Sequence, residues 1–535
     1  MSRKLFPQFF SVRQTAIVSV ILTLIALGIR LIGLSLDSLW FDEVFSVRAG
    51  RISVSDIIIL TRGDVHPPLY YLLLHFWMKL FGETEIAVRM LSVIFSVLTV
   101  FVVYHLALKL FNRRTAFFAA LFTTLSPLQV FYAQETRMYA QLTFLAAASV
   151  YFYVCWLKEG TRLSYAFYLI STTLLLYTHI YAVFVVMAQL LYFVWLRLQA
   201  RETFRKRLRG WLAAQLITGL LFLPWALIIF QQATRARRGF WIREPDWLTP
   251  LSTLIEYCGS LWLAALLLPL FVYGVKLVYE RSGKEKTASL PRVRVFLLLW
   301  LILPIIIPFM LSKLVTPFYL AKYTIAASLP FYLLAARGLE QVRGRLRQAV
   351  LLLLICLCFG LELSKDLISI KRERWNMAAY NVESAAQAND LVLFNSTGSY
   401  MSFAYYARRK DIEMAVFPYS ATDEQPTNDL TLLQRAAGEG FGSVHPPQTE
   451  QETEDRLKKI VGNRSRVWIV TRYGEGFRND FIKVFGNEFR ATAQPALCFN
   501  QRRFLFTENY SETDSAIFLQ QRGLGCSSQV YLLER

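Results

Sequence analysis

Eleven apolar runs, each long enough to cross about 30 Å of hydrocarbon, constrain the fold of this chain more than any other feature. A soluble protein of 535 residues would not carry so many uninterrupted runs, even with 55% hydrophobic residues. We therefore predict an α-helical polytopic membrane protein with about eleven transmembrane helices. The runs occupy residues 15–34, 85–108, 115–133, 137–157, 163–178, 181–197, 211–230, 254–279, 294–311, 319–336 and 348–364.

Basic residues are concentrated in the part of the chain that holds these runs. Residues 1–364 contain 37 Lys/Arg and 17 Asp/Glu, whereas residues 365–535 contain 21 of each, so the membrane part carries the whole net charge of +20. This distribution indicates topology signals in cytoplasmic loops, and no nucleic-acid partner is expected.

The basic loops orient the helices and decide how residues 68–81 are interpreted. With the N-terminus in the cytoplasm, five basic clusters fall on the cytoplasmic side, as the positive-inside bias predicts. Counting 68–81 as a span would move four of the five outside, so we interpret this stretch as a helix lying at the membrane interface. The clusters are Lys109 with Arg113 and Arg114, Lys158 with Arg162, and the basic residues within 197–209, 281–294 and 337–347.

This orientation predicts a multi-pass protein of the cell (plasma or inner) membrane, with a transmembrane domain at 1–364 whose first outer loop spans 35–84. After that domain, residues 365–535 alternate helix and strand patterns, interrupted by an acidic, Gly/Pro-rich stretch at about 420–450. They predict an extracytoplasmic α/β domain that serves for docking or as a lid. Cys498 and Cys526 fall in it and could form a disulfide on that side.

Polar groups in the first outer loop are the first candidates for chemistry. Asp42 and Glu43 follow the first run, where carboxylates are costly unless they face water, a partner charge or a substrate. A carboxylate there can act as general base on a sugar hydroxyl or hold a divalent metal ion. The alternative is a pair of solvated loop residues. His66 follows in the same loop, before two prolines that start the interfacial helix.

A second polar group joins two spans on the same outer side. Glu135 and Arg137 end one apolar run and begin the next, and Tyr139 lies beside them. Ions at this depth need partners. Glu135 and Arg137 are therefore either site residues or partners in a local salt bridge that stabilises the turn.

Arginines outside the cytoplasm form a third group. Arg235, Arg237 and Arg238 break the charge rule, which predicts an anionic partner, either a phosphate or anionic membrane lipids. Lys322 adds positive charge near the outer ends of the helices, or snorkels. His179 stands at the outer end of the fifth span, where a single histidine is more often structural than catalytic.

The ordered set of motifs resembles polytopic glycosyltransferases of the GT-C fold. It comprises Asp42-Glu43 after the first span, His66-Pro67-Pro68 before an interfacial helix, and a Ser-Pro…Glu-x-Arg-x-Tyr segment from Ser126 to Tyr139. Protein O-mannosyltransferases (glycosyltransferase family 39) and the transferases that add aminoarabinose to lipid A are the members it resembles most. The resemblance covers residues 35–240, and the segment around Lys322 more loosely.

The resemblance implies an inverting transfer of one sugar, mannose or a related hexose or pentose. The donor would be a polyprenyl-phosphate sugar, and the acceptor an extracytoplasmic protein, lipid or cell-envelope glycan. Asp42 would be the general base, Glu43 would support it or help hold Mg²⁺, Mn²⁺ or Zn²⁺, and Glu135 would be the second acid. Residues expected to bind substrate or its phosphate are His66, Arg137, Tyr139, Arg235, Arg237, Arg238 and Lys322.

Two departures and two rival functions accompany this interpretation. Family members often have Arg-Tyr where this chain has Lys322-Tyr323, and the C-terminal domain does not resemble the β-rich domain of the eukaryotic enzymes. A transporter is one alternative, although no internal repeat is found and the charges gather at span ends. A flippase for a lipid-linked sugar is the other, and it would need the basic cluster but not Asp42.

Overall fold

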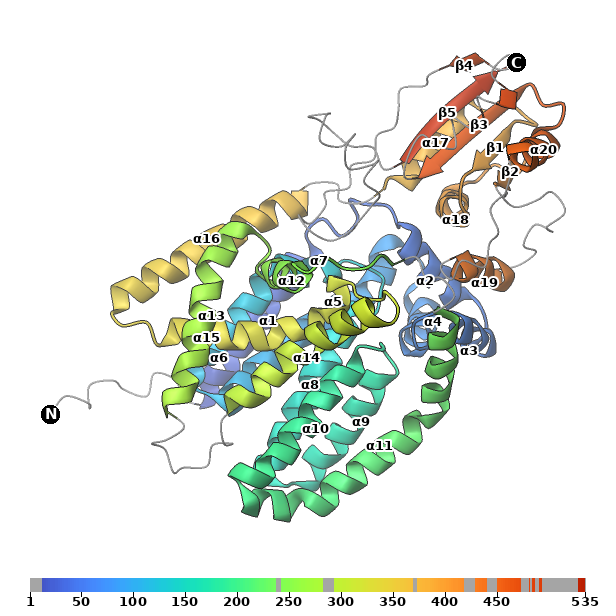
Figure 1. Cartoon of the computed structure of the whole chain (residues 1–535). Coiled ribbons are helices and arrows are strands. Elements are labelled where there is room, and N and C mark those ends of the chain that lie inside the picture. Colours follow the sequence, from blue (N-terminus) through green and yellow to red (C-terminus); the bar gives the residue numbers. More distant parts are fainter. Residues whose placement is uncertain are drawn as a thin grey trace.

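The protein, described by a computed structural model, consists of a bundle of apolar helices and a smaller α/β domain beside one end of it (Figure 1). The described residues are 12–236, 242–281, 293–368, 373–417, 429–439, 450–472, 481, 484–485, 490–492 and 528–534. Arg237, Arg238, Cys498 and Cys526 lie outside them, so the predictions made for these four residues stay predictions.

The bundle contains the helices predicted from the apolar runs, and caps fix where several begin. Thr84, Asn112 and Ser126 each accept a hydrogen bond from a backbone N–H three residues on. The helices are α1 (Val12–Leu31), α5 (Glu85–Leu110), α6 (Arg113–Leu125), α7 (Pro127–Ala133), α8 (Tyr139–Glu159), α9 (Arg162–Leu176), α10 (Ala182–Gln199), α11 (Arg201–Ala236), α12 (Thr249–Cys258), α13 (Leu261–Arg281), α14 (Val293–Leu314), η1 (Ala321–Ala327), α15 (Ser328–Glu340) and α16 (Arg345–Ile368).

All eleven predicted runs form helices, although not every one of these helices is long enough by itself to cross a membrane. In the described part of the chain, seven helices are long and apolar enough to cross a membrane, or nine if the bent pairs α6–α7 and α12–α13 each count as one. The other two predicted runs form α9, of 15 residues, and η1, of 7 residues, followed by α15, of 13 residues. A 15-residue helix is only about 22 Å long. Apolar composition alone does not separate a span from a shorter buried helix such as α15, nearly all of whose residues are buried.

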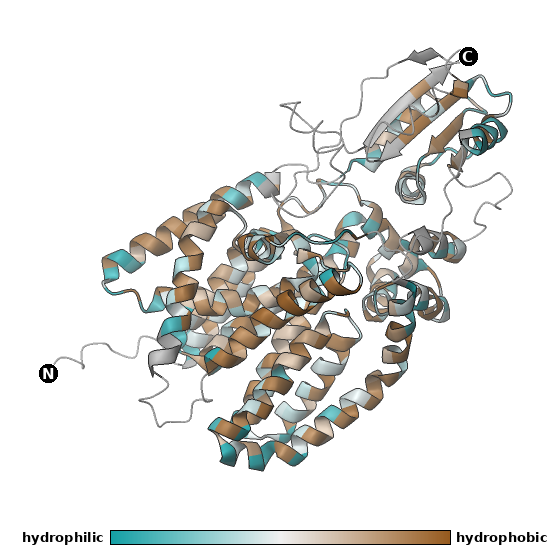
Figure 2. Ribbon diagram, viewed as in Figure 1, coloured by the Kyte–Doolittle hydropathy of each residue, from teal (hydrophilic) through white to brown (hydrophobic). Residues whose placement is uncertain are grey.

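Outer helices of the bundle present apolar side chains to the surroundings. Only 17% of the apolar stretch of α11 is buried, against 83% for α8. Leu216, Leu220 and Leu227 of α11 are 62%, 59% and 60% exposed. Figure 2 shows this hydrophobic colour along α11, α13 and α16, with hydrophilic residues at the helix ends. Such faces are stable in lipid rather than in water, which supports a multi-pass membrane protein.

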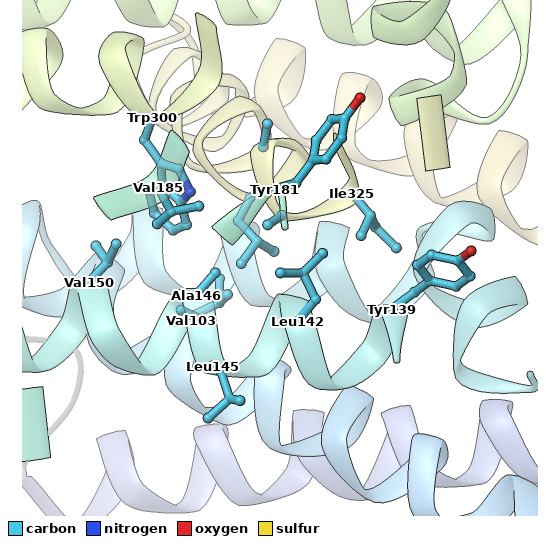
Figure 3. Packing of buried hydrophobic residues seen from close by; sticks show 14 of the residues in the cluster. Val103, Tyr139, Leu142, Leu145, Ala146, Val150, Tyr181, Val185, Trp300 and Ile325 are labelled. Carbon is cyan, nitrogen blue, oxygen red and sulfur yellow. The ribbon is translucent and has the colours of Figure 1, made fainter. Parts of the chain in front are cut away.

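Helix α8 lies at the centre of the packing. Figure 3 shows Leu142, Ala146 and Val150 on one side of α8, toward Val185 of α10 and Trp300 of α14. The spacing of four residues puts these three side chains on one helical face. Because its first residue is Tyr139, a well-packed α8 also fixes the segment just before it, where Glu135 and Arg137 lie.

Two glycines allow α13 and α15 to touch. A Cβ added to Gly274 would lie 2.0 Å from the Leu334 carbonyl oxygen, and one added to Gly338 would lie 1.9 Å from that of Leu270. Small residues at such crossings let helix backbones approach closely in membrane proteins.

The first outer loop folds into three helices between α1 and α5. They are α2 (Phe41–Arg51), α3 (Val54–Gly63) and α4 (Leu69–Phe81). The apolar stretch at 68–81 is a helix of 13 residues, too short to be among the candidate spans, in line with its interpretation as interfacial. Asp42 and Glu43 occupy the first turn of α2, where negative charge suits the helix dipole.

The C-terminal part is an α/β domain, as predicted. Its sheet has the order β2-β1-β3-β5-β4, with β1 parallel to β2 and β3, and β5 antiparallel to β3 and β4. The elements are α17 (Trp375–Ala385), β1 (Leu391–Phe394), α18 (Thr397–Tyr406), β2 (Glu413–Val416), α19 (Asp429–Glu439), α20 (Glu450–Val461), β3 (Arg466–Arg472), β4 (Arg490–Thr492) and β5 (Ser528–Glu534). Helix α19 leaves the sheet and packs against α2 and α3 (Figure 1).

Candidate active site

Most of the predicted site residues meet at the end of the bundle that faces the α/β domain. Together with His179, they come from five segments far apart in the sequence, and each segment lies at the end of a helix or in a short connection. The segments are the first turn of α2, the connection between α3 and α4, the connection between α7 and α8, the turn between α9 and α10, and η1.

The acidic pair on α2 divides into one buried and one accessible carboxylate. Glu43 is fully buried, and its two oxygens accept hydrogen bonds from Nε and Nη2 of Arg89 at 2.8 and 2.7 Å. Its Oε1 also accepts from the Thr136 backbone N–H at 2.9 Å. Asp42 is half-buried, and within the described residues no group donates a hydrogen bond to its carboxylate. Asp42 is therefore the member of the pair that a substrate can reach.

Arg89 of α5 explains why the chain turns as it does before α2. Besides binding Glu43, it donates hydrogen bonds to the carbonyl oxygens of Leu34, Asp37 and Ser38 at 2.8 to 3.1 Å. A fully buried guanidinium needs such partners, and here they are the backbone of one short segment. Arg89 thus fixes the position of the helix that carries Asp42.

The α/β domain holds the same segment from the other side. The Ser38 hydroxyl donates to the Glu373 carbonyl at 2.6 Å, and the Leu39 N–H donates to the Tyr406 hydroxyl at 2.7 Å. A Cβ added to Gly398 of α18 would lie 3.1 Å from the Phe41 ring, so the domain packs tightly next to Asp42.

Arg137 contacts α2 at Ser46, one helical turn after Asp42. Its Nη1 donates to the Ser46 hydroxyl at 3.3 Å and to the Tyr71 hydroxyl at 3.2 Å. The Tyr71 hydroxyl in turn donates to Oδ2 of Asp64 at 3.2 Å. Arg137 is 6% exposed, and its Nε has no hydrogen-bond partner among the described residues. Part of its donor fork is therefore available to a ligand.

Asp64 is a second carboxylate close to Asp42. Burial raises the pKa of Asp64, the charge of Arg137 opposes this rise, and the charge of Asp42 adds to it. The two carboxylates therefore influence each other, and Arg137 interacts favourably with both.

Two histidines meet beside this group. The ring centroids of His66 and His179 are 5.1 Å apart, and both rings pack on Tyr323 of η1, at 5.8 and 4.8 Å. Burial lowers the pKa of both imidazoles, and the charges of Arg137 and Lys322 lower it further, to about 3 for His179. Both are therefore neutral at physiological pH.

Lys322 and Tyr139 complete the group. The Lys322 ammonium lies 5.9 Å from the ring centroids of both Trp40 and Tyr139. Because Trp40 precedes α2 by one residue, Lys322 lies near the start of the helix that carries Asp42. Lys322 thus lies among the site residues, although lysine cannot bind a phosphate in the bidentate way of arginine.

Glu135 is buried beside Tyr139 of this group, whereas Arg235 lies outside it. Glu135 is 1% exposed and lies close enough to Tyr132 and Tyr139 for its charge to act on both phenols. Arg235 is exposed and donates to the Arg62 carbonyl at 2.6 Å, at the end of α3. The structure therefore places Arg235 at the rim rather than in the group around Asp42.

The described part of the chain shows no metal-ligand cluster. No group of three or more His, Cys, Asp or Glu side chains in the described ranges could hold an ion. Glu43 was predicted as a possible ligand, but both of its carboxylate oxygens accept hydrogen bonds from Arg89, and one also accepts from the Thr136 N–H. Moving this carboxylate to a metal would leave the buried Arg89 charge uncompensated, so the surroundings of Glu43 do not fit a divalent ion.

Four residues of the site were not among the predicted ones, namely Arg89, Asp64, Tyr71 and Tyr323. His179 belongs to the site as well, although its position at a helix end indicated a structural role. Asp64 and Tyr71 flank the His66-Pro67-Pro68 motif in the sequence, so extending that motif by a few residues on each side would have found them. Arg89 gives no such signal, since it stands in the first turns of an ordinary apolar helix.

The geometry suits a reaction in which a hydroxyl loses a proton and an anion departs. Asp42 is an accessible carboxylate that can accept the proton. Arg137 and Lys322 are fixed cations that can stabilise the developing negative charge.

Comparisons with known proteins give one family and several similar structures. Residues 65–228 match the family described as dolichyl-phosphate-mannose-protein mannosyltransferase, and no curated protein matches the sequence. The chain is similar to ArnT from Cupriavidus metallidurans in the apo state, with a TM-score of 0.58 and 13% identity over 89% of this chain and 96% of that one. ArnT bound to undecaprenyl phosphate gives a TM-score of 0.56 and 13% identity over the same shares.

AglB, the oligosaccharyltransferase of the archaeon Archaeoglobus fulgidus, is also similar. Its complex with an inhibitory peptide and a dolichol-phosphate gives a TM-score of 0.53 and 13% identity, covering 86% of this chain and 69% of that one. At identities this low, the likeness concerns the fold.

Proposed function

We propose that this chain, which has the fold of the GT-C glycosyltransferases, is an integral-membrane enzyme that transfers one sugar from a polyprenyl-phosphate donor to an acceptor hydroxyl. One observation carries the proposal. An accessible carboxylate, Asp42, stands in one buried group with two cations, Arg137 and Lys322, at the end of a membrane bundle. A lipid-anchored phosphate sugar would present its charged headgroup at that level of the membrane.

The reaction would be a single displacement. Asp42 removes the proton from the acceptor hydroxyl while that oxygen forms a bond to the anomeric carbon of the sugar. The bond between the anomeric carbon and the phosphate oxygen breaks, and its electron pair leaves with the polyprenyl phosphate. Attack and departure on opposite faces invert the anomeric configuration.

Arg137 and Lys322 would stabilise the departing phosphate. The charge on the leaving oxygen grows during the reaction, so cations held in place beforehand lower the barrier without having to reorganise. Arg137 is held by Ser46 and Tyr71, and Lys322 lies against Trp40 and Tyr139. We assign Tyr139 to the wall of this phosphate position and Glu135 as the second acid of the site.

Glu43 would act through position rather than by touching substrate. Its ion pair with Arg89 fixes the first turn of α2, which sets the direction of the neighbouring Asp42. This assignment replaces the direct catalytic or metal-binding role predicted for Glu43.

The similar structures support a polyprenyl-phosphate donor. One is ArnT with undecaprenyl phosphate bound, and another is AglB with a dolichol-phosphate. We further propose that the site and the α/β domain face the extracytoplasmic side, with the N-terminus in the cytoplasm, and that the acceptor is a protein, lipid or envelope glycan. The sugar is a hexose or pentose.

Sugar transfer by the purified protein in liposomes tests the function. Polyprenyl phosphates carrying mannose, glucose or arabinose serve as donors, and transfer is measured for the wild type, Asp42→Asn and the control Asp246→Asn. Asp246 is an exposed carboxylate just before α12. We expect Asp42→Asn to lose turnover and Asp246→Asn to keep it. Equal turnover in Asp42→Asn removes Asp42 as the base, whereas movement of the lipid without transfer from any donor favours a flippase.

A further inference from the structure

His66 and His179 form a buried pair of imidazoles that the proposed transfer step does not use. They are 3% and 0% exposed and come from two separate connections, α3–α4 and α9–α10. Their rings lie 5.1 Å apart and share contacts with Tyr323, which meets His66 edge-on at an interplanar angle of 89°. The ring centroids of Tyr139 and His179 are 6.3 Å apart, which places the pair next to the group around Arg137 and Lys322.

The hydrogen bonds of His179 fix which nitrogen carries its proton. Its Nδ1 accepts a hydrogen bond from the Tyr181 backbone N–H at 3.1 Å. In a neutral ring the proton is then on Nε2, which must act as a donor. Nε2 of His179 is buried and has no hydrogen-bond partner among the described residues.

His66 presents a similar unsatisfied atom. Its Nδ1 is buried and likewise has no partner in the part of the chain that the structure describes. Buried polar atoms in proteins are nearly always hydrogen-bonded, to protein, water or ligand. Two such nitrogens in adjacent rings, beside a proposed substrate site, indicate a ligand with several hydroxyl groups.

The charge state of the pair argues for an uncharged ligand group. Burial, together with Arg137 and Lys322, keeps both rings neutral, as their lowered pKa values indicate. A neutral imidazole cannot balance the charge of a phosphate. In the proposed site that charge is balanced by Arg137 and Lys322. It can donate to one sugar hydroxyl and accept from another.

We infer that His66 and His179 bind hydroxyl groups of the donor sugar, while Arg137 and Lys322 bind its phosphate. The inference rests on the proposed function. It gives the pair the role of selecting the sugar and locates that selection in the α3–α4 connection and the α9–α10 turn. It also assigns His179, whose Nε2–H donates, a substrate contact that its position at a helix end did not suggest.

Binding to lipids with and without a sugar tests this division. The full-length protein in nanodiscs is titrated with undecaprenyl phosphate and with undecaprenyl phosphates carrying mannose, glucose or arabinose. The variants are His66→Ala, His179→Ala, Arg137→Ala and the control His75→Ala. His75 is a buried imidazole of α4 whose Nδ1 is already bonded to the Gly50 carbonyl at 2.8 Å.

We expect His66→Ala and His179→Ala to bind the preferred sugar lipid about tenfold more weakly and the bare lipid unchanged, since a lost hydrogen bond is worth about that factor. We expect Arg137→Ala to weaken the binding of both kinds of lipid and His75→Ala to weaken the binding of neither. His179→Gln, whose amide donates near the position of Nε2, recovers part of the loss, and His179→Leu does not. Recovery also shows that folding is intact.

Three results overturn the inference. Equal loss for the bare and the sugar lipids in the histidine variants places the pair on the phosphate. No loss for any lipid makes the pair structural. A wild type that binds no sugar lipid more tightly than the bare lipid removes the sugar contact altogether. By contrast, a wild type that binds neither kind of lipid and transfers no sugar contradicts the proposed function itself.

Discussion

Arg48 on α2 forms an ion pair with Asp429 on α19, with Nη1 and Oδ1 2.5 Å apart. The two side chains are 12% and 28% exposed, so the pair is only partly screened by water. It connects the helix that carries Asp42 to a helix that the α/β domain extends toward the bundle (Figure 1). The domain is therefore held to the site by side chains as well as by backbone.

Breaking this pair should loosen the domain with a modest loss of activity. For Arg48→Ala and Asp429→Ala we expect each to lower turnover a few-fold, because a partly exposed pair contributes about 1 kcal/mol. The double variant should lose no more than the worse single variant. Additive losses would show that the two side chains act independently. Limited proteolysis between 406 and 429, measured alongside turnover, reports the loosening.

Removing one partner of the Glu43–Arg89 pair should destabilise the protein strongly. Breaking a buried ion pair costs about 3–5 kcal/mol, because the remaining charge has no compensation. We expect Glu43→Ala to lower the thermal unfolding midpoint in detergent far more than Asp42→Ala, with activity lost together with the fold. A Glu43→Gln variant that melts like the wild type and yet has no turnover would instead give Glu43 a direct catalytic role.

The two arginines described near the site should behave differently. Arg137→Ala should raise KM for the donor about tenfold or more, because a hydrogen bond to a charged group is lost. Arg235→Ala should change KM by about twofold at most, since its guanidinium is exposed and bonded to a backbone carbonyl. Steady-state kinetics with one donor decides the matter, and the reverse order of effects would move the phosphate position to the rim of the bundle.

Lowering the pH should destabilise the protein through the two imidazoles. Both have a pKa below the unfolded value near 6.5, and that of His179 is about 3. Between those values the unfolded state binds more protons than the folded state, so stability falls as pH falls below about 6.5. The slope is at most about 1.4 kcal/mol per pH unit for each group. As the pH is lowered from 7.5 to 4.5, the thermal unfolding midpoint of the wild type should fall more than that of His179→Gln. Equal falls in the two midpoints would contradict a buried neutral ring at His179.

Patterns within single segments predicted much of this architecture. Apolar runs indicated the helices of the bundle, and the two prolines before residue 69 indicated where helix α4 begins. The alternating segments after 371 indicated the α/β domain. These features depend on composition and local spacing, which a sequence displays directly. No helix was predicted within the acidic, Gly/Pro-rich stretch at about 420–450, yet its described residues form α19, because amphipathic contact with α2 and α3 outweighs its acidic composition.

Partners that meet across the chain could not be predicted in this way. Glu43 and Arg89 are 46 residues apart, and nothing near Arg89 distinguishes it from any arginine that begins a helix. His66 and His179 come together where the start of α4 meets the end of α9, and there the Leu69 N–H donates to the Tyr177 carbonyl. A motif shows which side chains are unusual, but tertiary packing decides which of them is buried and which is accessible.

The attachment of residues 34–43 on two sides has a consequence for catalysis. Arg89 holds this segment from α5, and Ser38 and Leu39 bond to the α/β domain, before any substrate arrives. The entropy of ordering the segment is lost during folding rather than during binding. The carboxylate proposed as the base is therefore pre-organised, and binding energy from the lipid donor remains available to orient the sugar.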